Sequence, residues 1–517
     1  MKNKVWQNPV FVLSAAIVFI LVLIGALMPV KFARVAEILY EFTTVDFGWF
    51  YLLTVFIIVV FLIGLAVSKY GSIQLAEEGA KPEFSFFTWI GMLFSAGFGV
   101  GLVFWGVAEP MSHFFTPPFE NIQAQSDRAA RLAMGYAFFH WGISQWAIFA
   151  LVGLVISFLQ FRKKKNGLVS TALEPVLGKK RPVKYTVDSL AVIATVMGIA
   201  TSLGLGVLQM NGGLKAVFGI NHSIGIQMII IVVMFSAYML SSLSGLDKGI
   251  RFLSNVNLWF SIGLLVFVLI TGPTLFILET FTLALGDYLS NFIQYSLRLQ
   301  PYVGGSWVRD WTIFYWAWTI AWSPYVGAFV ARVSKGRTIR EYLFGVMVIP
   351  PLIACLWIAV FGGTALWNDV HQGTEIAAAV NDDVTSALFL TFEQLPFTLL
   401  LSIVSILLIL TFLVTSADSA TYILASMSSN GSLTPPVFGK VVWGVTMSAV
   451  AAVLLYSGGL EALQTASLVS ALPFTAILLF LIVALVKLLR KEPLPLRKAD
   501  VRRFKRLAKM ANSDNEN

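Results

Sequence analysis

The sequence is short of charge and has almost no cysteine. Only 12% of its 517 residues are charged, whereas a soluble globular chain carries about a quarter. The single cysteine, Cys355, lies in an apolar run and can form no disulfide within the chain. Together with 57% hydrophobic residues, these shortages exclude intrinsic disorder, a disulfide scaffold and a nucleic-acid-binding domain. The remaining class is a polytopic membrane protein, because repeated apolar runs of about 20 residues are long enough to cross a bilayer.

Twelve such runs predict an all-α integral membrane protein with 12 transmembrane helices. Several of these runs are rich in tryptophan or glycine, and these runs do not resemble helices that face lipid. The expected spans lie near residues 9–30, 48–68, 88–108, 132–160, 185–209, 224–243, 252–277, 307–331, 342–362, 397–426, 438–457 and 464–488.

The distribution of basic residues orients the spans. If both termini are cytoplasmic, most of the 36 Lys and Arg residues fall on the cytoplasmic side, as the positive-inside rule requires. The run Arg162–Lys165 and the tail 489–517 contribute many of them. The tail is also expected to contact anionic lipid. Residues 278–300 are too polar to cross and have helical periodicity, which predicts an amphipathic helix at the interface.

Three glycines, Gly97, Gly99 and Gly101, alternate in the third span. Close packing of two helices through a GxxxG face would use Gly97 and Gly101 but leaves Gly99 unexplained. A locally unwound segment would use all three, because glycine reaches conformations that other residues avoid. Its freed carbonyls would then bind an ion or a substrate.

Aromatic residues lie deep in two other spans. Trp318 and Trp322 are four residues apart in the eighth span and therefore share a helix face. Trp141, Trp146 and Phe149 form a second cluster in the fourth span. Indole faces attract quaternary ammonium groups; packing against lipid or neighbouring helices is the alternative. Nearer the outer end, tryptophans 307 and 311 fit an interfacial aromatic belt.

Pro324 and Gly327 follow Trp322 and are expected to interrupt the eighth span, as the glycines interrupt the third. Interrupted helices at matching positions of two halves indicate an inverted-repeat transporter. Spans 3–7 and 8–12 would be the two five-helix repeats. The expected organisation is a cytoplasmic N-terminus (1–8), two additional spans (9–87), the first repeat (88–277), the interfacial helix and loop (278–306), the second repeat (307–488) and a basic cytoplasmic tail (489–517).

The tenth span carries several polar side chains, namely Thr415, Ser416, Asp418 and Ser419. Such groups are costly in hydrocarbon unless they line a cavity or bind something. Neighbouring hydroxyl oxygens suit a small hard cation such as Na⁺. Alternatively, Ser and Thr return their hydrogen bonds to the preceding turn, and Asp418 pairs with a basic residue.

The sequence resembles the betaine/carnitine/choline transporter family from Pro82 to about Lys487. The resemblance rests on PEFSFFTWIGMLFSAGFGVGLVFWGVAEP, FHWGISQWAIF, ATVMGIATSLGLGVLQMNGGL, WTIFYWAWTIAWSPYVGAFVARVSKGRTIREY and FLVTSADSATY. It implies a leucine-transporter-type fold, a homotrimer in the bacterial cell membrane, and uptake of a small zwitterionic or cationic solute. Most members couple uptake to Na⁺, some couple it to H⁺, and one carnitine exchanger needs no ion.

The same resemblance assigns candidate sites. The substrate would contact the unwound glycines and the two aromatic clusters. One sodium ion would bind carbonyls of the third and tenth spans together with two hydroxyls, and a second ion would bind between the fifth and eighth spans. The substrate residues are Gly97, Phe98, Gly99, Gly101, Trp141, Trp146, Phe149, Trp318, Thr319 and Trp322; the first sodium site is Ser95, Phe98, Phe412, Thr415 and Ser416, and the second is Thr195 and Tyr325.

The chain departs from the family pattern at some of these positions. Phe149 stands where the family often has Tyr, Thr319 where it usually has a second Trp, and Ile199 where the second sodium site needs a hydroxyl. Glycine betaine is the favoured solute, and choline, carnitine and ectoine stay open. The expected mechanism is Na⁺-coupled symport by alternating access, with H⁺ coupling or ion-independent exchange as alternatives. Substitution of Gly99 or Trp322 is expected to abolish uptake.

An integral-membrane enzyme is the rival class. The four histidines are scattered, Cys355 is apolar, and no metal-ligand spacing appears. We therefore expect no enzymatic activity and no cofactor beyond Na⁺. His140 adjoins Trp141 and is either a site residue or a packed histidine. No partner nucleic acid is expected.

Overall fold

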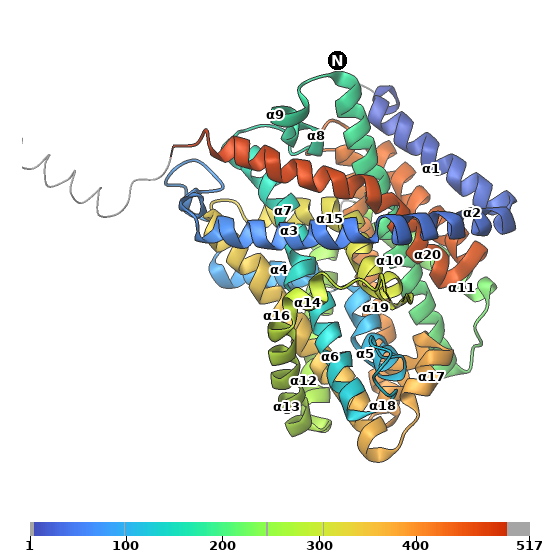
Figure 1. Cartoon of the computed structure of the whole chain (residues 1–517). Helices are drawn as coiled ribbons and strands as arrows, with labels where there is room; N and C mark the ends of the chain where they lie inside the picture. Colours follow the sequence, from blue (N-terminus) through green and yellow to red (C-terminus); the bar gives the residue numbers. More distant parts are fainter. Residues whose placement is uncertain (1–4, 98, 245–246, 303, 494–517) are drawn as a thin grey trace, which may run out of the picture.

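The computed structural model describes residues 5–97, 99–244, 247–302 and 304–493 (Figure 1). Over these residues the chain is helical, and the only β pairing is an isolated bridge between Gln74 and Thr338. The longer helices are α1 (Pro9–Leu27), α2 (Pro29–Glu41), α3 (Gly48–Val67), α4 (Phe86–Gly97), α5 (Val100–Phe115), α6 (Asp127–Trp141), α7 (Ile143–Ser157), α10 (Arg181–Phe218), α11 (Ile224–Ser244), α12 (Asp247–Thr271), α13 (Thr274–Ser290), α15 (Phe314–Val333), α16 (Ile339–Trp367), α19 (Thr398–Met427) and α20 (Val437–Leu489). The short ones are α8 (Val169–Ala172), α9 (Glu174–Leu177), α14 (Phe292–Ser296), α17 (Ile376–Asp382) and α18 (Ala387–Glu393).

Among the described residues, nine helices are long and apolar enough to span a membrane. The expected third span is divided between α4 and α5, the eighth is α15, and the eleventh and twelfth both lie in α20, in which two helical segments meet at a kink at Gly459. The prediction of a multi-pass helical membrane protein is confirmed. The count of twelve crossings, the two inverted repeats and the boundaries drawn between them stay predictions.

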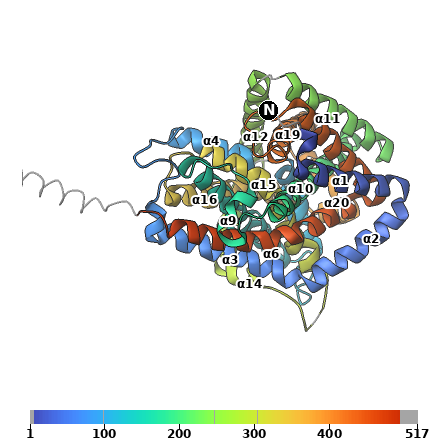
Figure 2. The ribbon, with the colours of Figure 1, turned by 90° about the horizontal axis from the view of Figure 1, so that it is seen from above.

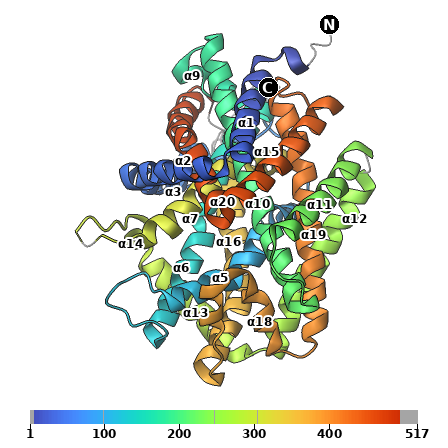
Figure 3. The ribbon, with the colours of Figure 1, turned by 90° about the vertical axis from the view of Figure 1, so that its right-hand side faces the viewer.

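Helices α10 and α15 lie in the middle of the bundle, and α11 and α12 pack against α19 at one edge (Figures 2 and 3). Most side chains of α10 are buried, whereas most of those on α11 and α12 that the structure describes are not. This difference follows from composition. The exposed edge is apolar on its outer face, as lipid requires, while α10 carries the small residues that allow close packing.

The break in the third span is confirmed. Helix α4 ends at Gly97 and α5 begins at Val100, with Gly99 in an extended conformation (φ −131°, ψ 175°). A second break, which the sequence did not predict, separates α6 from α7 at Gly142. The fourth span is therefore also two helices.

The predicted break in the eighth span is wrong. Helix α15 continues through Pro324 to Val333. Proline has no N–H to donate and so leaves the carbonyl one turn earlier, that of Ile320, without its helical partner. The Ser323 hydroxyl donates to this carbonyl at 2.7 Å, and a neighbouring hydroxyl is one of the means by which spanning helices tolerate proline. Of the two matching breaks that suggested two repeats, the one in the third span is present and the one in the eighth span is not.

The segment 278–300 is helical, as predicted, and forms most of α13 and α14. Helix α13 packs against α6 and α16. Arg131 of α6 donates two hydrogen bonds to Asp287 of α13, at 2.7 and 2.5 Å. Because a bidentate arginine–carboxylate pair fixes orientation as well as distance, α13 is held firmly against α6.

The basic run after α7 is paired with acidic residues. Arg162 lies 2.6 Å from Glu492, three residues after the end of α20, and Lys163 pairs with the same carboxylate. Burial acts to raise the pKa of Glu492, but its hydrogen bonds to Lys163 and Arg162 outweigh burial and lower it. Arg162 also donates to the carbonyls of Gln74 and Ala76 at 3.2 and 3.1 Å. These contacts hold the segment that follows α20 against the segment after α7, which in turn contacts the loop that contains Gln74 and Ala76.

Candidate functional site

A cavity lies between α5, α7, α10, α15 and α19, next to the break between α4 and α5. Six of its eighteen lining residues are aromatic, and the remainder are glycines, polar residues and aliphatic residues. Its lining is Gly99, Val100, Gly101, Leu102, Trp141, Gln145, Trp146, Phe149, Ile199, Ser202, Leu203, Trp318, Thr319, Trp322, Tyr325, Leu413, Ser416 and Ala417.

The two aromatic clusters predicted from the sequence meet in this cavity. The Trp141 and Trp318 rings are nearly perpendicular, at 84° and 6.2 Å between centroids. Trp318 and Trp322 are stacked at 23° and 6.3 Å, which is the outcome of their four-residue spacing on α15. Phe149 links the remaining rings: its ring centroid lies 6.1 Å from that of Trp322 and 5.6 Å from that of Trp146. Several ring faces thus surround one space, the arrangement that binds an organic cation.

The helix break brings glycine backbone against the indole edges. A Cβ atom on Gly101 would overlap Cη2 of Trp318 and lie 3.4 Å from Cη2 of Trp141. At Gly99 the added atom would lie 3.6 Å from Cη2 of Trp322, an ordinary contact. The packing of the pocket therefore requires a residue without a side chain at Gly101.

The second break, at Gly142, lies between Trp141 and the start of α7. The Ile143 amide donates to the Tyr288 hydroxyl of α13 at 2.9 Å, which satisfies a donor that the break leaves free. A Cβ on Gly142 would lie 2.5 Å from both this hydroxyl and the Phe138 carbonyl. Helix α13 thus holds the joint that positions the aromatic residues of α6 and α7.

Two acceptor atoms in the pocket wall have no hydrogen-bond partner among the described residues. They are Oε1 of Gln145 and Oγ1 of Thr319, and both are buried. The Trp318 N–H, by contrast, donates to the Ser202 hydroxyl at 3.2 Å. Because an unpaired buried polar atom costs free energy, these two atoms are open to hydrogen bonds with a bound molecule, the amide oxygen as an acceptor and the hydroxyl as an acceptor or a donor.

The structure places eight of the ten predicted substrate residues around this cavity; their role in binding stays a prediction. Gly97 ends α4, and its surroundings lie outside what the structure describes. Phe98 lies outside the described residues. Gln145 and Ser202 line the pocket but were not predicted, because a single polar residue in an apolar run has no periodic signal.

Of the predicted sodium residues that the structure describes, Ser416 and Tyr325 line the cavity, whereas Phe412 and Thr415 do not. Ser416 lines the cavity, and the Tyr325 hydroxyl donates to its carbonyl at 3.4 Å. Thr415 donates to the carbonyls of Thr411 and Phe412 at 3.0 and 3.1 Å. Thr415 therefore makes the hydrogen bonds within its own helix that were the alternative to ion binding.

Other parts of the sodium prediction are less well placed. Thr195 donates to the Ala191 carbonyl at 2.7 Å and is not part of the lining, although Tyr325 is. Phe98 lies outside the described residues, and so does the side chain of Ser95. Asp418 accepts a hydrogen bond from Ser241 at 2.7 Å.

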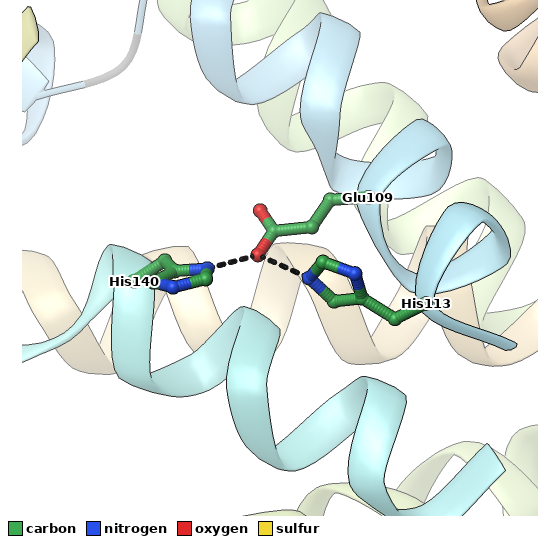
Figure 4. A group of neighbouring side chains, drawn as sticks. All are labelled: Glu109, His113 and His140. Carbon is green, nitrogen blue, oxygen red and sulfur yellow. Dashed lines mark hydrogen bonds and ion pairs between the residues drawn. The ribbon is translucent and has the colours of Figure 1, made fainter. Parts of the chain in front are cut away.

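Glu109, His113 and His140 form a buried polar cluster (Figure 4), which adjoins the pocket wall at Trp141. The Glu109 carboxylate of α5 is 2.6 Å from Nδ1 of His140 and 3.2 Å from Nε2 of His113, and all three side chains are fully buried. Glutamate and two histidines are also a donor set for zinc. However, ligands of one tetrahedral zinc ion lie about 3.3 Å apart, so the 2.6 Å contact is a hydrogen bond with no space for an ion between its atoms.

The surroundings of this cluster correct the prediction of an interfacial aromatic belt. Trp307 and Trp311 do not form an interfacial belt, because they pack on the His113 ring at centroid distances of 4.8 and 4.4 Å. His140 adjoins the pocket wall through Trp141. Glu109 was not singled out from the sequence, although a carboxylate within an apolar span is a signal of function by itself.

Comparison with known proteins agrees with the residues on which the resemblance rested. The family model described as "BCCT, betaine/carnitine/choline family transporter" matches residues 9–494. The chain is 64% identical to an ectoine/hydroxyectoine transporter of Virgibacillus pantothenticus, over 95% of this chain and 98% of that protein. It is 45% identical to the glycine betaine transporter OpuD of Bacillus subtilis, over 95% and 96%. It is 39% identical to a glycine betaine transporter of Acinetobacter baylyi, over 93% and 73%.

Proposed function

This chain belongs to the betaine/carnitine/choline transporter family, and from this premise we propose that it takes up ectoine and hydroxyectoine. It is a multi-pass membrane transporter of compatible solutes of the betaine/ectoine type, and not an enzyme. The proposal concerns which of these solutes it carries. Glycine betaine, the solute favoured by the sequence, becomes the second candidate.

The unpaired acceptors of the pocket support ectoine. Ectoine is a zwitterion whose positive charge is a cyclic amidinium bearing N–H groups, whereas the trimethylammonium group of glycine betaine has no hydrogen to donate. Oε1 of Gln145 and Oγ1 of Thr319 are free to accept such N–H groups, while the surrounding rings hold the cation by its faces. Thr319 also marks a departure from the family pattern. The higher identity to the ectoine carrier favours the same solute.

Replacing Thr319 by valine tests this assignment, because valine keeps the shape and removes the acceptor. We expect the dissociation constant for ectoine to rise about tenfold, which corresponds to one hydrogen bond to a charged group. Affinity for glycine betaine should change less than twofold. Calorimetry on the purified protein measures both. Thr319→Ser, which keeps the hydroxyl, is the matched control and should bind ectoine as the unmodified protein does. Equal losses for the two solutes in Thr319→Val would contradict the role of the hydroxyl.

We also propose that uptake is coupled to Na⁺, supported by Ser416 in the pocket wall and by the helix break next to it. In proteoliposomes, an inward Na⁺ gradient should stimulate ectoine uptake. Ser416→Ala should raise the Na⁺ concentration needed for half-maximal uptake about tenfold, as expected for loss of one oxygen ligand. Thr411→Ala, one turn earlier on α19, should not. Uptake driven by a proton gradient, or exchange without any ion, would replace this proposal by one of its two alternatives.

We also propose a membrane location, an orientation and an oligomeric state for the protein. The positive-inside distribution supports cytoplasmic termini in the bacterial cell membrane, and the basic tail 489–517 supports contact with anionic lipid. A homotrimer rests on the family resemblance. Cross-linking of the protein in native membranes, followed by mass determination, tests the trimer directly.

A further inference from the structure

The Glu109 carboxylate, which the proposed function does not use, contacts the pocket wall through one indole. The Trp141 N–H donates to its Oε2 at 2.9 Å, and the Tyr315 hydroxyl donates to the same oxygen at 2.5 Å. The other oxygen, Oε1, is the one bound by His113 and His140 (Figure 4). All four neighbours thus reach the carboxylate through groups that can donate a hydrogen.

This environment is that of an ionised carboxylate. An ionised group accepts all four hydrogen bonds, whereas a protonated one would have to donate one of them. His140 is satisfied as a neutral donor, because its other ring nitrogen lies 2.9 Å from the Thr312 hydroxyl. Among the described residues, the ion-pair partners of Glu109 are histidines, and no Lys or Arg approaches it. The negative charge is therefore left close behind the aromatic wall.

Trp141 connects this charge to the pocket. The pyrrole edge of its indole is held by Glu109, while Cη2 of the opposite edge points to Gly101 at the helix break. A hydrogen bond from an indole N–H to an anion moves electron density into the ring system. Because cation–π attraction depends on the negative charge of the ring face, the ring becomes a better ligand for a cation in the pocket.

We propose that Glu109 is a positioning residue for solute binding: its charge polarises and orients the Trp141 indole, and so attracts the cationic end of the solute to this wall. The inference rests on the proposed function, since it requires a solute with a positive charge. It also sets the direction of a zwitterion, because the carboxylate of the solute is repelled from the side of Glu109. Specificity for cationic over anionic or neutral solutes would then begin with a residue that touches no solute.

The test is a double-mutant cycle on the purified full-length protein, with ectoine and glycine betaine as probes. Glu109→Gln keeps the size of the side chain and removes its charge, and should weaken binding of the transported solute about tenfold. Trp141→Phe removes the N–H through which Glu109 acts. In the Trp141→Phe background the further effect of Glu109→Gln should therefore be less than twofold. Tyr315→Phe is the matched control, since it removes a donor from the same oxygen and should leave affinity within twofold.

Three results would overturn the inference: unchanged affinity in Glu109→Gln, a full tenfold effect that persists without the Trp141 N–H, or an equal loss in Tyr315→Phe. The last would show that the cluster only supports the fold. If Glu109→Gln is not recovered folded, 3-benzothienylalanine at position 141 replaces it, because this residue keeps a bicyclic ring without the N–H; unchanged affinity there has the same meaning. Failure of the unmodified protein to bind either probe would instead count against the proposed function.

Discussion

Replacing Gly101 by alanine is expected to lower solute uptake about a hundredfold in a protein that still reaches the membrane. The added methyl group would occupy the position of Cη2 of Trp318 and press on Trp141. Neither indole can move freely, because the Trp318 N–H is bonded to Ser202 and the Trp141 N–H to Glu109. Overpacking a tight site costs about 1–3 kcal/mol, and here the cost falls on the binding pocket. Uptake of labelled ectoine, normalised to the amount of protein in the membrane, measures the effect.

Gly99→Ala is the matched comparison two residues earlier. Its Cβ would be 3.6 Å from Trp322, and its extended backbone is open to any residue. We expect uptake to fall less than threefold. This reverses the expectation drawn from the sequence, in which Gly99 was the critical glycine because the GxxxG pattern did not explain it. Equal losses at both positions would show that the joint needs glycine for flexibility and not for space.

Replacing Trp322 by leucine should raise the concentration for half-maximal uptake about thirtyfold. Trp322 is the central ring of the pocket, stacked on Trp318 and in edge contact with Phe149. A cation–π contact in a desolvated site contributes about 2 kcal/mol, and this free energy corresponds to about thirtyfold in affinity. The maximal rate should change less than the half-saturating concentration, because the substitution removes a binding contact.

Two further variants make the Trp322 result specific. Trp322→Phe keeps a smaller aromatic face and should lie between the unmodified protein and Trp322→Leu. Trp259→Leu removes a tryptophan that is 70% exposed on α12, outside the pocket, and should bind normally. An unchanged half-saturating concentration in Trp322→Leu would exclude the aromatic pocket as the binding site.

The sequence predicted the features of the fold that depend on composition. Runs of apolar residues locate the helices, and alternating glycines locate the break before α5, because both signals are local. The expected break at Pro324 was wrong for the opposite reason. The prediction considered proline alone and not the preceding residue, Ser323, whose hydroxyl donates to the carbonyl that proline leaves free. The break at Gly142 was missed because a single glycine in an apolar span has no distinctive pattern.

The candidate site was predictable in its aromatic part and not in its polar part. Trp318 and Trp322 share a face by their spacing, and the second cluster is visible as aromatic residues deep in the fourth span. The role of Glu109 depends on four donors from α5, α6 and α15 that converge on one carboxylate, a property of tertiary structure alone. The free acceptors on Gln145 and Thr319 are likewise visible only when their surroundings are known.

The continuity of α15 has a consequence for how the pocket opens. Trp318, Thr319 and Trp322 lie on one uninterrupted helix, so they must move as a rigid unit. The opposite wall is hinged, because Gly101 and Trp141 lie beside the ends of helices that meet at Gly99 and Gly142. When the pocket opens, the backbone is therefore expected to bend at Gly99 and Gly142 and α15 is expected to keep its shape. Spin labels placed along α15 should therefore keep their mutual distances when solute is added, whereas distances between α6 and α7 should change.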